Sequence, residues 1–307
     1  MSTNLIEQSK SDIKKGSKSF ALASFFFSQK EKEAAWKLYS WCRYCDDVID
    51  HAASLAEAQQ QVQILIDKTN QCYRSEIPAE HPWPALAQVI RDYKIPSQYP
   101  LDLLRGFKMD AEGYRIVDEV GLFDYCYCVA GTVGLMMCHV MNVNSQQALQ
   151  NAVDLGRAMQ LTNISRDIKE DFLNSRVYLP ESWLRESGLT RTNFFETQHR
   201  DRLRAVVEKL MTEAQRRYQS GLRGLQYLPL RSAWAVCIAL FVYREIGRQV
   251  LRKNSWDQRI IIPMSRKLGL LFRASLYLLP VMAVRLFKPW KASPQIHLWS
   301  ENSPPSP

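Results

Sequence analysis

The sequence predicts an all-α protein folded as a single domain. Apolar residues recur at helical spacing along most of its 307 residues, and no stretch shows the sustained alternation that marks a strand. A composition of 46% hydrophobic and 23% charged residues is that of a folded chain able to bury a sizeable core. No interdomain linker or solenoid repeat is visible. We therefore expect one helical domain over residues 1–290 and a flexible Ser/Pro-rich tail over residues 291–307.

The expected helices follow from the apolar periodicity and from the residues that break it. The first two are long, and a proline cluster over residues 78–84 separates them from a short helix that ends near Tyr93. Later apolar stretches predict six more helices, the last of which precedes the tail. Besides the short one, the expected helices cover residues 31–51, 55–73, 101–114, 122–141, 146–172, 193–226, 231–253 and 268–287.

Cysteine usage indicates a reduced, cytoplasmic protein. The seven cysteines are an odd number scattered through apolar helical stretches, and no secretory leader opens the sequence. Cys42 and Cys45 form a CxxC pair, but no second pair or nearby histidine completes a zinc site and no strand precedes the pair. We interpret both as small core residues on a helix.

The net charge of +9 is concentrated near the C-terminus. From Arg244 onward eleven Lys or Arg residues face three acidic ones. The apolar stretch over residues 268–287 has its longest charge-free run at 274–284, which is short of the ~20 residues that span a bilayer. A basic amphipathic segment suits peripheral contact with an anionic membrane, and a terminal helix packed on the body with solvated basic residues explains it equally well. No nucleic-acid reading motif accompanies the charge, so a nucleic-acid partner is not expected.

Two helices carry paired aspartates on one face. Asp46 and Asp50 are four residues apart, and at ~100° per residue they share a stripe roughly 60° wide with Tyr39 and Arg43. The second stripe, roughly 80° wide, consists of Gln160, Asn163, Asp167 and Asp171.

Helix stability does not explain these stripes, because like charges four residues apart destabilise a helix. Mg²⁺ does, since it takes oxygen ligands and bridges carboxylates to substrate phosphates. Two facing stripes could thus hold a diphosphate through Mg²⁺, and Mn²⁺ could replace it. The alternative is two solvated acidic faces. A di-iron site would need Glu-x-x-His pairs, and none of the five histidines stands in that relation to a glutamate.

These patterns resemble the squalene and phytoene synthases, whose two aspartate-rich motifs match residues 46–50 and 167–171. The resemblance also includes Gly16-Ser-Lys-Ser-Phe20, residues 39–43, 125–134 and 160–166, the run 174–180, and Tyr243. It extends from about Ser9 to Lys253. It implies an isoprenoid-synthase-type helical bundle with a central apolar cavity.

The resemblance also implies roles for individual residues. The magnesium ligands would be Asp46, Asp50, Asn163, Asp167 and Asp171. Catalysis would use these aspartates together with Arg43 and Tyr125, whose ring, like that of Tyr127, could face cationic carbon. Ion pairs with neighbouring aspartates are the alternative for Arg43 and Arg166. The diphosphates and prenyl chains would contact Gly16, Ser17, Lys18, Ser19, Phe20, Tyr39, Arg43, Val129, Gly134, Gln160, Asn163, Arg166 and Tyr243.

The small residues over 129–134 interrupt a helix where glycine costs ~1 kcal/mol relative to alanine. We expect them to allow close approach of a prenyl chain or of a neighbouring helix.

The implied activity is head-to-head condensation of two molecules of geranylgeranyl diphosphate, through a cyclopropylcarbinyl diphosphate, to phytoene without NADPH. Chain length, the absence of a C-terminal anchor and the segments 255–259 and 297–299 resemble the bacterial carotenoid-forming members. The same chemistry on two farnesyl diphosphates, giving squalene or dehydrosqualene, is the nearest alternative. A class I terpene cyclase acting on one substrate and a non-catalytic helical protein that docks on membranes are the others.

Overall fold

The computed structural model describes residues 2–16, 18–254, 256 and 258–287, and every regular element in that part of the chain is helical. The expected tail, residues 291–307, lies outside the described residues. The all-α prediction is confirmed. The elements are α1 (Ser2–Gly16), α2 (Lys18–Ser24), α3 (Gln29–Asp50), α4 (Leu55–Tyr73), α5 (Trp83–Tyr93), α6 (Gln98–Ala111), α7 (Glu119–Cys126), η1 (Tyr127–Gly131), α8 (Thr132–Val140), α9 (Gln146–Leu173), α10 (Glu181–Glu186), η2 (Thr197–His199), α11 (Arg200–Gly224), η3 (Leu225–Tyr227), α12 (Leu230–Lys253) and α13 (Met264–Phe287).

Side-chain caps fix where the site-bearing helices begin. At the start of α3 the Ser28 hydroxyl accepts from the Glu31 backbone N–H, and the Glu31 carboxylate accepts from the Ser28 N–H at 2.9 Å. This reciprocal pair is a capping box. The Ser145 hydroxyl caps α9 by accepting from the Ala148 N–H. Both helices therefore start close to their expected positions and run on to the aspartates near their C-terminal ends.

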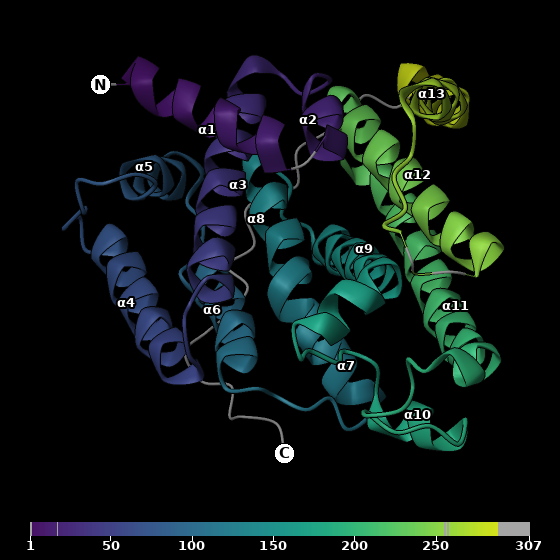
Figure 1. Ribbon diagram of the computed structural model, residues 1–307. Coiled ribbons are helices and arrows are strands. Elements are labelled where there is room, and N and C mark those ends of the chain that lie inside the picture. Colours follow the sequence, from purple (N-terminus) through teal and green to yellow (C-terminus); the bar gives the residue numbers. More distant parts are fainter. Residues whose placement is uncertain (1, 17, 255, 257, 288–307) are drawn as a thin grey trace.

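The bundle is organised around α9. This helix packs against α8, α11 and α12, while α3 packs against α4, α5 and α6. Figure 1 shows α8 and α9 in the middle of the molecule, with α4 and α5 on one side and α11, α12 and α13 on the other. Two apolar clusters result, one around α9, α11 and α12 and one around α3 to α6, and α8 contributes buried residues to both.

Glycines let α8 and α9 approach closely. A Cβ at Gly134 would lie 2.6 Å from the carbonyl oxygen of Ala152 on α9, and one at Gly156 would overlap the carbonyl group of Ala130. Backbone cannot move aside as a flexible side chain can, so only glycine fits at either position. The expected close approach of a neighbouring helix at residues 129–134 is confirmed.

The helix expected over 122–141 is present as the stretch Glu119–Val140, which contains the π-helical turn η1 between α7 and α8. Other expectations about helix positions were wrong. The helix over 193–226 begins only at Arg200, because Thr190 and Asn193 form a turn in which each side chain accepts from the other's backbone N–H. Helices α1, α2 and α10 were not expected at all.

Within the described residues, Glu119–Val140 is the one helical stretch long and apolar enough to cross a membrane. It packs against α6 and α9 in the interior of the bundle, which accounts for its composition.

Candidate active site

The two aspartate motifs lie close together. Asp50 ends α3, and Asp171 lies in the last turn of α9. Arg176, just after α9, connects them: its Nη1 donates to Asp50 Oδ1 at 2.6 Å, and its backbone N–H donates to the carbonyl oxygen of Asp171 at 2.8 Å. Segments more than a hundred residues apart in the sequence thus form one polar site.

Arginines neutralise three of the aspartates. Arg43 donates to Asp46 at 3.1 Å and also pairs with Asp47. Arg166 Nε donates to Asp167 Oδ1 at 2.8 Å, and Arg259 reaches the same carboxylate at 3.1 Å. The ion pairs considered as the alternative for Arg43 and Arg166 are present. They also place both guanidinium groups beside the aspartates, where a diphosphate could share them.

The aspartates sit in an environment that opposes full ionisation. Burial raises the pKa of Asp46 to about 7, and the neighbouring Asp50 adds to the effect. Burial raises the pKa of Asp171 to about 8, and the neighbouring Asp167 adds to it. Crowded carboxylates of this kind bind a cation that replaces their protons.

Sequence analysis missed a further carboxylate beside the two aspartate motifs. Asp110, on α6, accepts from the Tyr125 hydroxyl at 3.0 Å and from the Tyr178 hydroxyl at 2.7 Å. Its charge contributes to the raised pKa of Asp46 and of Asp171, and burial raises its own pKa to about 6. The signal that could have revealed it is its position on the buried stripe of α6, seven residues after Leu103 and three after Phe107.

Arg176, Tyr178 and Arg259 were not singled out either. Arg176 and Tyr178 lie in the run 174–180 that carried part of the resemblance, but without a role. Arg259 is positioned by Trp256, whose Nε1 donates to the Ser165 carbonyl oxygen on α9 at 2.8 Å. The position of this loop depends on a tertiary contact that local sequence does not specify.

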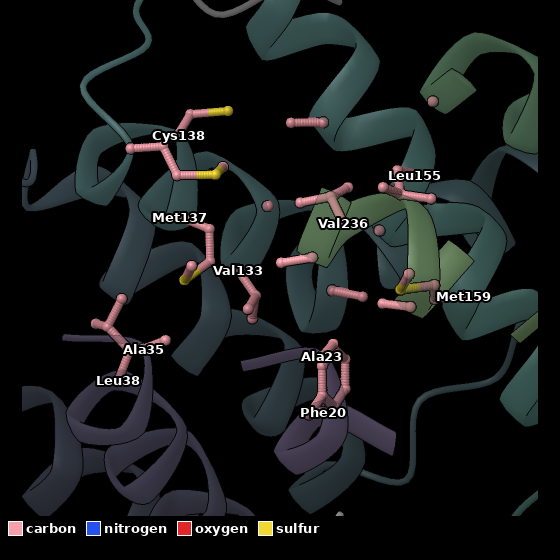
Figure 2. Close-up of a pocket in the computed structure, with 18 of the residues that line it drawn as sticks. Phe20, Ala23, Ala35, Leu38, Val133, Met137, Cys138, Leu155, Met159 and Val236 are labelled. Carbon is pink, nitrogen blue, oxygen red and sulfur yellow. The ribbon is translucent and has the colours of Figure 1, made fainter. Parts of the chain in front are cut away.

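An apolar cavity of about 310 Å³ lies beside the aspartates. Helices α2, α3, α8, α9 and α12 line it, and in Figure 2 the labelled side chains approach one common space from these elements and end in carbon or sulfur. Cys42 and Asn163 line the cavity one turn before Asp46 and Asp167 respectively. The cavity therefore leads to the site.

Most of the substrate-contact residues predicted from the resemblance line this cavity. They are Phe20, Tyr39, Val129, Gly134, Gln160, Asn163 and Tyr243. The Phe20 ring lies 6.4 Å from that of Tyr39 and 5.6 Å from that of Tyr243. Gly16 packs directly on the Tyr39 ring, where a Cβ would overlap the hydroxyl. Ser17 and the side chains of Lys18 and Ser19 lie outside the described residues.

Tyr125 and Tyr127 are placed apart from the cavity lining. Tyr125 is buried beneath the aspartates, stacked on Tyr178 with ring centroids 4.8 Å apart. One face of its ring is covered by that contact, and its hydroxyl is directed at Asp110. Tyr127 donates to Asp102 at 2.8 Å, with Arg157 over its ring. The catalytic role of Tyr125 stays a prediction.

The donor atoms at the site fit a hard divalent cation. Asn163 Oδ1 is buried without a hydrogen-bond partner, while its Nδ2 donates to Gln160. An unpaired amide oxygen beside carboxylates is a suitable Mg²⁺ ligand. No three acidic, histidine or cysteine side chains of the described residues already converge as a complete metal cage. All seven cysteines are unpaired, and Cys45 is buried.

Paired aspartates at the mouth of an apolar cavity within an α-helical bundle define a class of enzyme, the all-α isoprenoid synthases. The Squalene/phytoene synthase model matches residues 13–266. The chain belongs to the squalene/phytoene synthase family, whose members use prenyl diphosphates.

Curated relatives and solved structures agree with this assignment. The 15-cis-phytoene synthases of Enterobacter agglomerans and Pantoea ananas are 44% and 41% identical over 85% of this chain, covering 91% and 87% of theirs. A dehydrosqualene synthase crystallised with a ligand matches with a TM-score of 0.83 and 29% identity, over 90% of this chain and 97% of that one. The squalene synthase of Alicyclobacillus acidocaldarius, 20% identical, shares the fold, with a TM-score of 0.73 over 82% of this chain and 94% of that one.

Proposed function

We propose that this protein joins two molecules of geranylgeranyl diphosphate head to head to form phytoene, releasing both diphosphates. It requires Mg²⁺, for which Mn²⁺ can substitute, and does not use NADPH. The observation that carries the proposal is the meeting of the Asp50 and Asp171 segments, joined by Arg176, at the mouth of an apolar cavity.

The residues around the aspartates are suited to bind and release diphosphate. Five residues would hold Mg²⁺, namely Asp46, Asp50, Asn163, Asp167 and Asp171. When bound, it neutralises charge on the diphosphate oxygens as the allylic C–O bond breaks. Arg43, Arg166, Arg176 and Arg259 provide guanidinium groups that can share the same oxygens in a fork geometry.

The cavity protects the carbocation left by ionisation. Its lining is dominated by apolar side chains such as Val133, Met137, Leu155 and Met159, so water and basic groups are largely excluded from the hydrocarbon region. The cation can then add to the allylic double bond of the second prenyl diphosphate, and loss of a proton closes the ring of the cyclopropylcarbinyl diphosphate. A second ionisation releases the remaining diphosphate, and rearrangement of the resulting cation with loss of a second proton yields phytoene.

The choice of the C20 substrate is supported by the relatives, since those with identities of 44% and 41% are named 15-cis-phytoene synthases. The second candidate is the same chemistry on two farnesyl diphosphates, favoured by the close structural match to a dehydrosqualene synthase.

The test is to incubate purified protein with Mg²⁺ and either geranylgeranyl or farnesyl diphosphate, without NADPH, and to identify the hydrocarbons by mass spectrometry. We expect C40 phytoene from the longer substrate. A C30 hydrocarbon alone, or no product unless NADPH is added, contradicts the proposal. Asp171→Asn should abolish product formation, whereas Asp92→Asn, an exposed residue on α5, should leave it unchanged.

A reducing cytoplasm is our proposed location. All seven cysteines are unpaired and six are buried, as expected where thiols stay reduced. Fractionation of cells producing a tagged chain tests this: recovery from the cytoplasmic compartment supports it, and recovery from the periplasm contradicts it.

A further inference from the structure

The outward side of α13 exposes a continuous apolar stripe. Its residues recur every three or four positions and each is between 48% and 64% exposed, and at ~100° per residue they cover an arc of about 120°. The opposite side of the helix is buried against α12. We call the exposed residues the α13 stripe: Met264, Leu268, Phe272, Leu276 and Leu279.

Positive charge borders the α13 stripe on one side. Arg266 and Arg273 project next to it, and Arg244 and Arg248 of α12 lie beside them. The pKa of Arg244 is lowered by burial and by the charges of Arg248 and Arg273, so these three guanidinium groups are near neighbours. Within the described residues, Glu245 is the one acidic partner recorded for the four arginines, and it pairs with Arg266 at 3.0 Å and Arg248 at 3.9 Å. The edge stays strongly positive.

A second exposed apolar group, Phe25, Leu230 and Trp234, continues the same side of the molecule. The helix α12 contacts both α2 and α13, and Phe26 packs on Trp234 with ring centroids 4.9 Å apart. The helix α13 crosses α12: Arg266 pairs with Glu245, the Ala274 carbonyl oxygen accepts from Cys237, and the Tyr277 ring lies 5.9 Å from that of Phe241. Figure 1 shows α2, the start of α12 and α13, viewed nearly end-on, along one edge of the molecule.

The apolar cavity lies directly behind this second group. Ala23 and Phe27 line the cavity on either side of exposed Phe25, and Ala235 and Val236 line it next to exposed Trp234. The same two segments thus face the cavity on one side and solvent on the other. The far end of the cavity is separated from the surface by a single layer of side chains.

We propose that the α13 stripe together with Phe25, Leu230 and Trp234 forms a docking face for an anionic lipid bilayer. The exposed apolar residues enter the interfacial region while the arginines bind lipid phosphates, as in interfacial amphipathic helices. A second copy of the chain fits this face poorly, because a twofold contact would bring two arginine clusters together. The arginines also make α13 unsuited to cross the bilayer. Docking does not depend on the proposed function; only the release of a hydrocarbon product into the bilayer rests on it.

The experiment measures sedimentation of the full-length protein with vesicles, without substrate, so that its result is independent of activity. We expect binding to vesicles containing phosphatidylglycerol and much weaker binding to pure phosphatidylcholine. Replacing Phe272 and Leu276 together by serine should lower the partition coefficient at least about tenfold. Replacing Arg248 or Arg273 by glutamine should lower it about fivefold each on anionic vesicles only. The control is Ile64→Ser, which changes an apolar residue on α4 that is 42% exposed and lies outside the proposed face.

A second measurement keeps the test independent of folding. Circular dichroism checks that each variant is folded like wild type. The difference in tryptophan fluorescence emission between wild type and Trp234→Phe reports on the surroundings of Trp234. A blue shift of that difference on anionic vesicles supports docking. Any of three results would overturn the proposal. They are the absence of this shift, equal binding by the Phe272/Leu276 variant and wild type, and equal binding to both lipid compositions. A lipid-free dimer that the same serine variant dissociates would assign the face to a second copy instead.

Discussion

Divalent-metal binding should depend steeply on pH, because two of the proposed ligands must lose protons first. With pKa values of about 7 for Asp46 and about 8 for Asp171, both groups are largely protonated at pH 6. If both must ionise, the apparent affinity should fall by a factor on the order of several hundred between pH 8 and pH 6. Solvent reaches 39% of the Asp46 side chain and screens part of its shift, so Asp171 contributes more of this dependence.

The assay is calorimetric titration of the substrate-free protein with Mg²⁺ or Mn²⁺ in buffers of different ionisation enthalpy. At pH 7 metal binding should release about 1.4 protons, falling to nearly none at pH 9. Aspartates with ordinary pKa values, near 3.9, would release none at either pH. An affinity that is flat from pH 6 to pH 8, without proton release at pH 7, refutes the reasoning.

The raised pKa values of Asp46 and Asp171 also affect the stability of the fold. When folding raises the pKa of a carboxyl group, that group stabilises the protein fully at pH values below its pKa in the unfolded chain. The stabilisation is lost as the pH rises through its pKa in the folded protein. The melting temperature of the metal-free protein should therefore decrease from pH 5 to pH 8.5, and Mg²⁺ should reduce the decrease. A decrease of equal size in Asp171→Asn would contradict this origin.

Three substitutions test other parts of the structure. Asp110→Asn should lower kcat strongly and move the pH midpoint of metal binding downward, because it removes a charge that raises the pKa of Asp46 and Asp171. The control is Asp102→Asn, also on α6, which removes the charge of a carboxylate that accepts from Tyr127 and should leave the midpoint unchanged. Gly156→Ala should destabilise the fold by about 1–3 kcal/mol in denaturant titration, since the new Cβ meets backbone, whereas Gly269→Ala, with open space around it, should be neutral or slightly stabilising. Arg176→Gln should raise KM for the diphosphate substrate at least about tenfold. The melting temperature of this variant should stay near that of wild type, because an exposed ion pair contributes only ~1 kcal/mol or less to stability. An unchanged KM would exclude Arg176 from substrate binding.

The sequence predicts the long helices α3, α4, α9 and α12 well, because apolar residues recur along them and because serine caps the first three and Pro229 precedes α12. It does not predict α1, whose composition is mostly polar and whose buried contacts, at Ser9 and Ile13, depend on α3. The first seven residues of the expected 193–226 helix form a turn and the short 3-10 helix η2 instead, and the turn begins where the side chains of Thr190 and Asn193 compete for backbone N–H groups.

The paired aspartates could be found from the sequence because helical spacing alone places them on one face. Asp110 could not be assigned in the same way, since no second acidic residue lies three or four positions from it on α6 and its partners come from two other segments. The connection made by Arg176 is likewise a tertiary contact across 126 positions. Spacing rules identify side chains that share a helix, and they do not identify side chains brought together by helix packing.

The π-helical turn η1 makes the distance between Tyr125 and Gly134 intolerant of changes in chain length. A π-turn accommodates one residue more than an α-turn, so it behaves as a retained single-residue insertion. Deleting one residue from Tyr127–Gly131 would restore an unbroken α-helix and rotate everything before it by about 100° relative to α8. With Gly134 held against α9, that rotation would carry the Tyr125 hydroxyl away from Asp110. Insertions and deletions in this segment would therefore separate Tyr125 and Asp110 from the cavity wall that contains Gly134.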